Sequence, residues 1–167
     1  PYDDDAPTVL AQLRELAEAP DVDAVATLYP LPAGIDPLEA AQIVGAAKDI
    51  DGLHPTSAGL LALGAPARAP ATAQACLLCA RELLGPLKGA EVVVVGASRI
   101  VGRPLALMLL EEEATVAVCH AATRDLTAHT RRADLVVTAA GVAGLIGADH
   151  VKTGATIINV AIVRTAN

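Results

Sequence analysis

The residues best suited to chemistry follow a run of valines. Four consecutive valines at 92–95 predict a strand buried on both faces, as in a parallel sheet. Gly96 then begins a turn that leads through Gly102 into an apolar helical run. A strand, a glycine turn and a helix direct backbone N–H groups and a helix amino terminus at a phosphate. The spacing is Gly-x-Ser-x-x-x-Gly, with Ser98 in place of the second glycine, so a purely structural turn remains the alternative.

The cysteines and histidines are weaker candidates. Cys76 and Cys79 form a Cys-x-x-Cys pair, but their apolar helical flanks favour two buried helical cysteines over redox or metal chemistry. No spacing of His, Cys, Asp and Glu predicts a metal site. His120 ends a predicted strand, where a nucleotide contact and a structural role both fit. The other histidines are expected to be structural or cleft-lining at His54 and exposed at His129 and His150.

Composition excludes several classes of function. Of the 167 residues, 53% are hydrophobic, with two Tyr and no Phe or Trp, so the core must be aliphatic. The scarcity of aromatic side chains and the net charge of −7 argue against nucleic-acid binding. No uninterrupted apolar run reaches the roughly 18 residues of a membrane span, so no such span is expected, and a signal peptide is not expected either. Three cysteines without such a signal favour a reducing cytoplasm.

The elements that must position these residues alternate in type along the second half of the chain. This alternation predicts an α/β fold with a parallel sheet and right-handed crossovers. The expected strands are 91–95, 115–118, 135–138 and 156–160, with helices at 103–112 and 126–132 between them.

The first half is expected to be a smaller unit. The sequence predicts a helix at 8–18, a strand at 24–28, and a helix that Asp36 caps with Pro37 in its first turn. Residues 49–70 are expected to be rich in loops, and Thr72 to cap a helix ending at Leu84.

Several motifs occur in an order that resembles one family. The residues that carry the resemblance are Gly96, Ser98, Ile100, Val101, Gly102, Arg103, Pro104, Cys119 and His120, and upstream the segments 30–32, 48–55 and 61–64 and Thr72. In this order they are similar to the bifunctional methylenetetrahydrofolate dehydrogenase/cyclohydrolase family. The resemblance implies a Rossmann-like NAD(P)-binding domain over 73–167 and part of an N-terminal folate-binding, catalytic α/β domain over 1–72.

The family resemblance also implies an activity and its site. Such proteins transfer a hydride from methylenetetrahydrofolate to NADP or NAD and then hydrolyse the methenyl product. Asp51 matches the carboxylate that holds the pterin amino groups, a task suited to a group that accepts two parallel N–H bonds. The alternative is a loop Asp that caps the turn at Gly52. By the same resemblance the cofactor-binding residues are Gly96, Ser98, Arg99, Ile100, Gly102, His120 and Thr72. A folate-type substrate and a homodimer through the Rossmann domains are also implied.

Asp49 and Lys48, beside Asp51, are expected to be a turn or capping residue and a solvated side chain, respectively. The sequence also departs from the family pattern. None of the three lysines stands in the family's Tyr-x-x-x-Lys motif, which is expected upstream of Pro1, and Leu28 replaces a glutamine that positions that lysine.

Further departures concern the cofactor. Ala97 and Ala121 replace an Arg and a Ser near the 2′-phosphate of NADP, and residues 159–164 differ from the family's Asp-Val-Gly-Ile-Asn-Arg. Two other hypotheses therefore stay open. One is a catalytically impaired paralogue that binds a nucleotide or a protein, and the other is a different NAD-dependent oxidoreductase.

Overall fold

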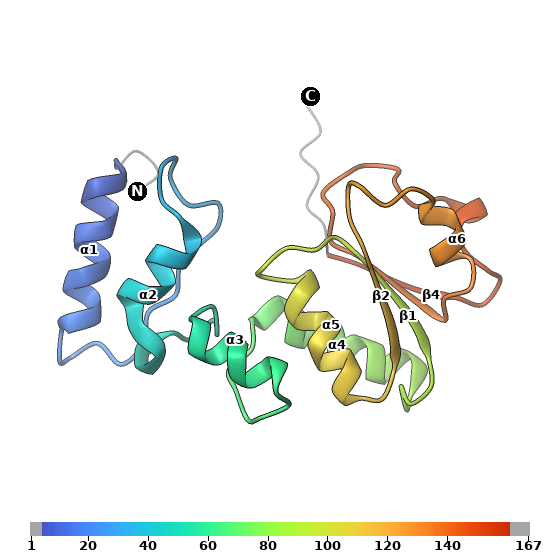
Figure 1. Ribbon diagram of the computed structural model, residues 1–167, viewed down its shortest axis with the longest axis horizontal. Helices are drawn as coiled ribbons and strands as arrows, with labels where there is room; N and C mark the ends of the chain where they lie inside the picture. The colour runs from blue at the N-terminus through green and yellow to red at the C-terminus, as the bar shows by residue number, and fades with distance from the viewer. Residues whose placement is uncertain (1–4, 161–167) are drawn as a thin grey trace. The chain divides into compact units, whose positions relative to one another are not determined.

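A computed structural model of the protein describes residues 5–160. The chain divides into two compact units, Pro1–Pro70 and Ala71–Asn167, each with its own core. The two units are shown in blue to green and in green to red in Figure 1. Within 5–160, no helix has the length and hydropathy that a bilayer crossing requires.

The second unit is built on a parallel sheet of four strands. These are β1 (Glu91–Val95), β2 (Thr115–Cys119), β3 (Leu135–Thr138) and β4 (Thr156–Asn159), in the order β2-β1-β3-β4. The register pairs Val93 with Ala117 on one side and with Val136 on the other. This arrangement confirms the predicted α/β fold with a parallel sheet.

Helices cover both faces of this sheet (Figure 1). On one face, α4 (Ala71–Leu84) and α5 (Gly102–Glu111) pack with Val92 and Val94 into a single aliphatic cluster. On the other face, Val93 and Val95 pack beside α6 (Leu126–Thr130) and the loop that precedes a short 3-10 helix, η1 (Ala148–His150). The run of four valines is thus explained by burial on both sides, which contributes about 1.5–3 kcal/mol for each fully buried side chain.

The boundaries in this unit differ slightly from those expected. Two strands, 91–95 and 135–138, are confirmed residue for residue, whereas β2 continues to Cys119 and β4 ends at Asn159. The α5 helix begins at Gly102 and α6 ends at Thr130. Thr72 is the second residue of α4 and not the residue before its first turn.

The first unit contains α1 (Ala6–Glu18), α2 (Pro37–Lys48) and α3 (Pro55–Ala62). Asp36 caps α2 as predicted, because its carboxylate accepts the Leu38 N–H at 3.0 Å. A small cluster joins these elements and the segments between them through Leu13, Val25, Ile35, Ala40 and Val44.

One expectation for this unit is wrong, and another is incomplete. Residues 24–28 do not form a strand. Val25 pairs with Asp49 in an isolated parallel bridge, and one such pair does not make a ladder of paired residues. The segment 49–70 is rich in loops as predicted, but it also contains the unpredicted helix α3. His54 caps this helix, because its Nδ1 atom accepts the Thr56 N–H. Pro55 is the first residue of the helix, and its fixed φ angle already suits a helical conformation.

Candidate functional site

The turn between β1 and α5 has no room for side chains at two of its positions. Gly96 has φ +120°, and a Cβ atom there would lie 2.7 Å from the carbonyl oxygen of Ala139. A Cβ atom at Gly102 would overlap the carbonyl oxygen of Gly96. The first glycine therefore lets the loop after β1 meet the loop after β3, and the second lets α5 pack against the end of β1.

Ser98 holds the start of α5. Its Oγ atom accepts the N–H groups of Val101 at 3.1 Å and Gly102 at 3.4 Å, which have no partner within the helix. Arg103 donates from Nε to the carbonyl of Ala97 at 3.0 Å and so braces the same turn. The result is an ordered loop at the positive end of a helix dipole, which favours an anion.

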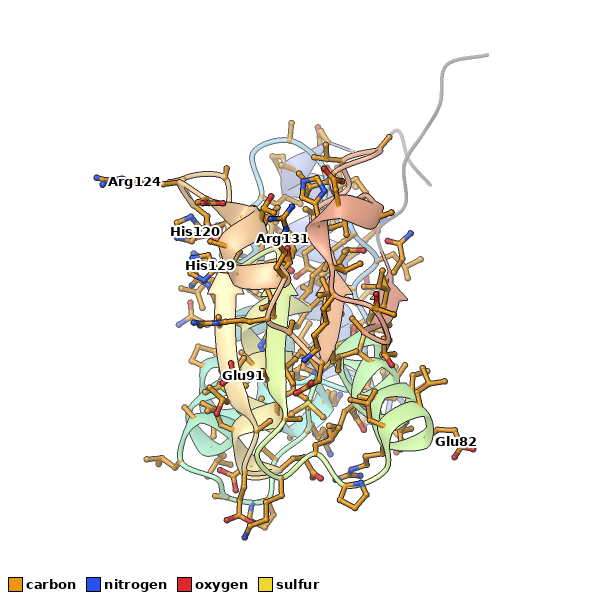
Figure 2. The ribbon with its side chains drawn as sticks, turned by 90° about the vertical axis from the view of Figure 1, so that its right-hand side faces the viewer. Glu82, Glu91, His120, Arg124, His129 and Arg131 are labelled. Atoms are coloured by element: carbon orange, nitrogen blue, oxygen red, sulfur yellow. The ribbon has the colours of Figure 1, made fainter. Side chains whose placement is uncertain are left out.

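His120 lies just beyond the carboxyl end of β2 and is exposed. Its backbone N–H donates to Thr123 Oγ1 at 2.9 Å, and its Nδ1 accepts the Ala122 N–H at 3.2 Å. Nδ1 acts as an acceptor here, so the neutral ring carries its proton on Nε2. Figure 2 shows His120 on the same side of the unit as Arg124, whose side chain extends away from the ribbon.

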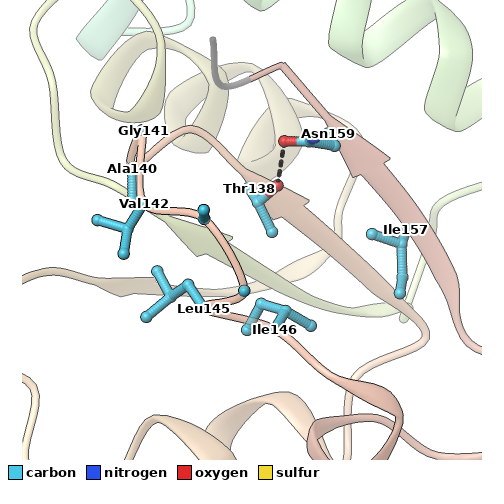
Figure 3. Close-up of a pocket in the computed structure, with 10 residues that line it drawn as sticks. Thr138, Ala140, Gly141, Val142, Leu145, Ile146, Ile157 and Asn159 are labelled. Atoms are coloured by element: carbon cyan, nitrogen blue, oxygen red, sulfur yellow. Dashed lines mark hydrogen bonds between the residues drawn. The ribbon is translucent and has the colours of Figure 1, made fainter. Parts of the chain in front are cut away.

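A cavity of about 200 Å³ lies at the carboxyl ends of β3 and β4. Its walls are the loop residues 140–146 with Thr138, Ile157 and Asn159, as Figure 3 shows. Thr138 and Asn159 join the two strand ends by a hydrogen bond of 2.7 Å between Oγ1 and Oδ1. Sequence reasoning missed this cavity; the one available signal was the run of small residues that follows β3.

The strand order explains why the turn and the cavity are near one another. From β1 the chain crosses to β2 on one side, and from β3 it crosses to β4 on the other, so β1 and β3 flank a topological switch point. Ligands of open α/β sheets bind beyond the carboxyl ends of the strands at such a point. Gly96 and Ala139 follow these two strands directly.

The two aspartates of the first unit differ in their surroundings. Asp49 is buried, with 4% of its surface exposed, and accepts the His54 N–H at 2.6 Å, which confirms it as a turn residue. Asp51 is half-buried, and within residues 5–160 no hydrogen bond or ion pair engages its carboxylate. Lys48 is not simply solvated, because its Nζ donates to the carbonyls of Ala19 at 2.6 Å and Leu16 at 3.3 Å, at the end of α1.

The sequence-predicted residues therefore fall in three places. The largest group occupies the β1–α5 turn and its neighbouring strand end: Gly96, Ser98, Arg99, Ile100, Gly102 and His120. Thr72 lies exposed in the first turn of α4, and Asp51 lies in the first unit.

The remaining cysteine and histidine expectations are partly wrong. Cys76 is buried as predicted, whereas Cys79 is exposed because it lies on the outer face of α4. Burial raises the pKa of the Cys76 thiol. His129 and His150 are half-buried rather than exposed, and the Nδ1 atom of His150 accepts the Gly147 N–H at 3.2 Å. No cluster of His, Cys, Asp and Glu among residues 5–160 could hold a metal ion.

Comparisons with known proteins agree with this arrangement. Residues 70–167 match the family model described as "Tetrahydrofolate dehydrogenase/cyclohydrolase, NAD(P)-binding domain". The chain is 47% identical over 156 residues to the bifunctional protein FolD 1 of Rubrobacter xylanophilus, covering 93% of this chain and 55% of that protein. It is 43% identical over 159 residues to the bifunctional protein FolD of Cupriavidus necator, with 95% and 56% covered.

Solved structures give the same result. A Trypanosoma brucei methylenetetrahydrofolate dehydrogenase-cyclohydrolase, complexed with NADP cofactor and inhibitor, superposes with a TM-score of 0.91 at 32% identity, covering 100% of this chain and 58% of that one. A methylenetetrahydrofolate dehydrogenase from Bombyx mori gives 0.90 at 35% identity, with 98% and 60% covered. The chain thus spans little more than half the length of these relatives. On the match over residues 70–167 and the identity over most of its length, the chain belongs to the tetrahydrofolate dehydrogenase/cyclohydrolase family.

Proposed function

We propose that this protein serves one-carbon metabolism as a methylenetetrahydrofolate dehydrogenase/cyclohydrolase. In this assignment residues 73–167 form the domain that binds NADP or NAD, and residues 1–72 form part of the domain that binds folate. The observation that carries the proposal is the β1–α5 turn, where glycine at 96 and 102 keeps side chains away from the switch point between β1 and β3.

The residues of this turn suit a dinucleotide. The missing Cβ atoms let the backbone approach a diphosphate closely, and the amino terminus of α5 favours its negative charge. Ser98, Arg99 and Ile100 would complete the turn, His120 would contact the adenosine side, and Thr72 would line the same site. The bound cofactor supplies a hydride acceptor for the one-carbon bridge of the folate.

Asp51 suits the other ligand. A carboxylate with no protein partner in the described part of the chain can accept two N–H bonds from the amino-pyrimidine edge of a pterin. The neighbouring Asp49 cannot take this role, since its carboxylate is buried and holds the His54 N–H. We therefore assign pterin binding to Asp51 and the shape of its loop to Asp49.

Hydrolysis of the methenyl product is proposed as the weaker of the two activities. Leu28 stands where the family has a glutamine, and it has 80% of its surface exposed. Its side chain can neither donate nor accept a hydrogen bond, so it cannot orient an acid or base. A positioned acid or base contributes about 10²–10⁴-fold in rate.

The proposal extends to the cellular setting. We propose a cytoplasmic homodimer that has no nucleic-acid or membrane partner. The support is the three free cysteines, the net charge of −7 and the family resemblance. Sedimentation of the purified protein at micromolar concentration would test the dimer, because a single species with the mass of one chain would contradict it.

Calorimetric titration with NADP, NAD and 5-formyltetrahydrofolate, a stable folate, tests the assignment. We expect all three to bind, and Asp51→Asn to lower folate affinity about tenfold or more while leaving nucleotide affinity unchanged. Asp21→Asn, at an exposed position of the same unit, is the matched control. Nucleotide binding without folate binding would favour the paralogue hypothesis instead. Reduction of NADP by methylenetetrahydrofolate, followed by absorbance, tests the dehydrogenase step itself.

A further inference from the structure

Arg68 contacts the segment that carries Asp51 from two sides. Its Nη1 atom donates to the carbonyl of Asp49 at 3.3 Å. Its own carbonyl group lies against Gly52, which has φ +66°, so closely that a Cβ atom at this glycine would overlap it. Asp51 stands between these two contact points, and so its backbone is fixed from both ends by one residue.

The same guanidinium group also holds the end of α2. Nη1 donates to the carbonyls of Ala46 at 3.0 Å and Ala47 at 2.9 Å, two groups that the helix leaves without an internal partner. The helix is already interrupted at Gly45, which has non-helical dihedral angles. A positive charge at this end also suits the helix dipole. Arg68 thereby ties the loop after α2 to the helix that precedes it.

We propose that Arg68 is a positioning residue for Asp51, holding its loop so that the carboxylate is presented to the pterin before the ligand arrives. This inference rests on the proposed role of Asp51 in folate binding. Arg68 lies 17 positions along the chain from Asp51 and belongs to none of the motifs that indicate the family. Pre-organisation of a binding group raises affinity, because a loop that folding has already ordered loses less conformational entropy when the ligand binds.

The test compares variants of the full chain by calorimetric titration with 5-formyltetrahydrofolate, under conditions where circular dichroism shows each variant to be folded. Arg68→Ala should raise the folate Kd about five- to tenfold, and Arg68→Lys should restore most of the loss, since an ammonium group can also donate to carbonyls. Arg14→Ala is the matched control, because Arg14 is an exposed arginine of the same unit with no partner among residues 5–160. It should leave the Kd unchanged.

A double-mutant cycle separates positioning from a general loss of structure. In an Asp51→Asn background, Arg68→Ala should lower affinity no further, because the group that it positions is gone. An equal loss in both backgrounds would overturn the inference, as would a Kd within twofold of the parent for Arg68→Ala while Asp51→Asn still loses tenfold. If the parent protein binds no folate, the proposed function fails, and this inference fails with it. Should Arg68→Ala not fold, Arg68→Gln takes its place with the same expectations.

Discussion

The Cα atom of Gly102 faces the carbonyl oxygen of Gly96 with no space for a Cβ atom between them. Gly102 is also the first residue of α5, where alanine would normally favour the helix. The packing conflict exceeds that preference, so Gly102→Ala should lower the free energy of unfolding by about 1–3 kcal/mol and weaken NADP binding. Urea unfolding and calorimetric titration measure the two effects.

Gly59→Ala is the control for this substitution. Gly59 lies within α3, and a Cβ atom there would meet nothing within 4 Å. Alanine should therefore raise the free energy of unfolding by about 0.5–1 kcal/mol. The two glycine substitutions are expected to act with opposite signs, and a stabilising Gly102→Ala would show that the turn can relax.

Cofactor preference should be weak. Ala97 and Ala121 carry no side-chain donor for a 2′-phosphate, and no acidic residue ends β2 to hold a ribose 2′-hydroxyl. We expect Kd values for NADP and NAD within about tenfold of each other, and Ala97→Arg to shift the ratio toward NADP. If the parent protein instead binds NADP more than tenfold more tightly than NAD, an arginine must bind the 2′-phosphate. Arg99→Ala should then abolish the difference between the two Kd values.

Substitution of Asp49 should lower stability, whereas substitution of Asp51 should lower folate affinity. Asp49→Ala leaves the His54 N–H without its acceptor and should cost about 1–3 kcal/mol of stability. Asp51→Ala breaks no hydrogen bond within the described part of the chain and should change stability by less than about 0.5 kcal/mol while weakening folate binding. Equal losses of stability in the two variants would contradict this division of roles.

Stability should fall at acid pH partly through Asp134. Its carboxylate accepts Lys152 Nζ at 2.6 Å and the Glu91 N–H at 2.8 Å, and these bonds lower the pKa of Asp134 below its ordinary value. Asp134 therefore contributes fully to the free energy of unfolding at pH values above its unfolded-state pKa. This stabilisation is lost as the pH falls through the lower pKa that Asp134 has in the folded state. Both side chains are about two-fifths exposed, so solvent screening limits the effect to less than about 1 kcal/mol.

Asp134→Asn should flatten the stability profile in this acid range, as followed by urea unfolding at a series of pH values. Lys152→Met should reproduce part of the change. Added salt should weaken the contribution of Lys152 in the parent protein but not that of the backbone N–H. A profile that Asp134→Asn leaves unaltered would show that other carboxylates dominate acid unfolding.

Thiol reactivity should distinguish the three cysteines. Cys79 is exposed, whereas Cys76 and Cys119 are buried, and burial raises the pKa of both buried thiols. One thiol per chain should react rapidly with an aromatic disulfide reagent at pH 8, and all three after unfolding. Cys79→Ser should remove the rapid phase; rapid reaction of two thiols in the folded protein would contradict the burial of Cys76 or Cys119.

The sequence predicted the second unit better than the first for physical reasons. The strands at 91–95 and 135–138 are runs of apolar residues that are mostly buried, so composition alone marks them. The helix α3 was missed because a histidine ring nitrogen starts it, and this is not among the usual capping groups. Residues 24–28 contain β-branched side chains, but a strand also needs a partner along its whole length.

The candidate site divides in the same way. Gly96, Ser98 and Gly102 could be identified because a turn places them by local spacing. The cavity depends on how the loop 140–146 lies against the ends of β3 and β4. The three hydrogen bonds from Arg68 to backbone carbonyls depend on residues about 20 positions earlier in the chain. Apart from the run of small residues after β3, neither relationship leaves a periodic or local pattern in the sequence.

The absence of aromatic side chains from the second unit has a spectroscopic consequence. Both tyrosines, at positions 2 and 29, precede Pro70, and the chain has no tryptophan or phenylalanine. Intrinsic ultraviolet fluorescence therefore reports on the first unit alone, while far-ultraviolet dichroism reports on both. Melting curves recorded by the two methods on one unlabelled sample would reveal whether the two halves of the protein lose their structure together or in separate steps.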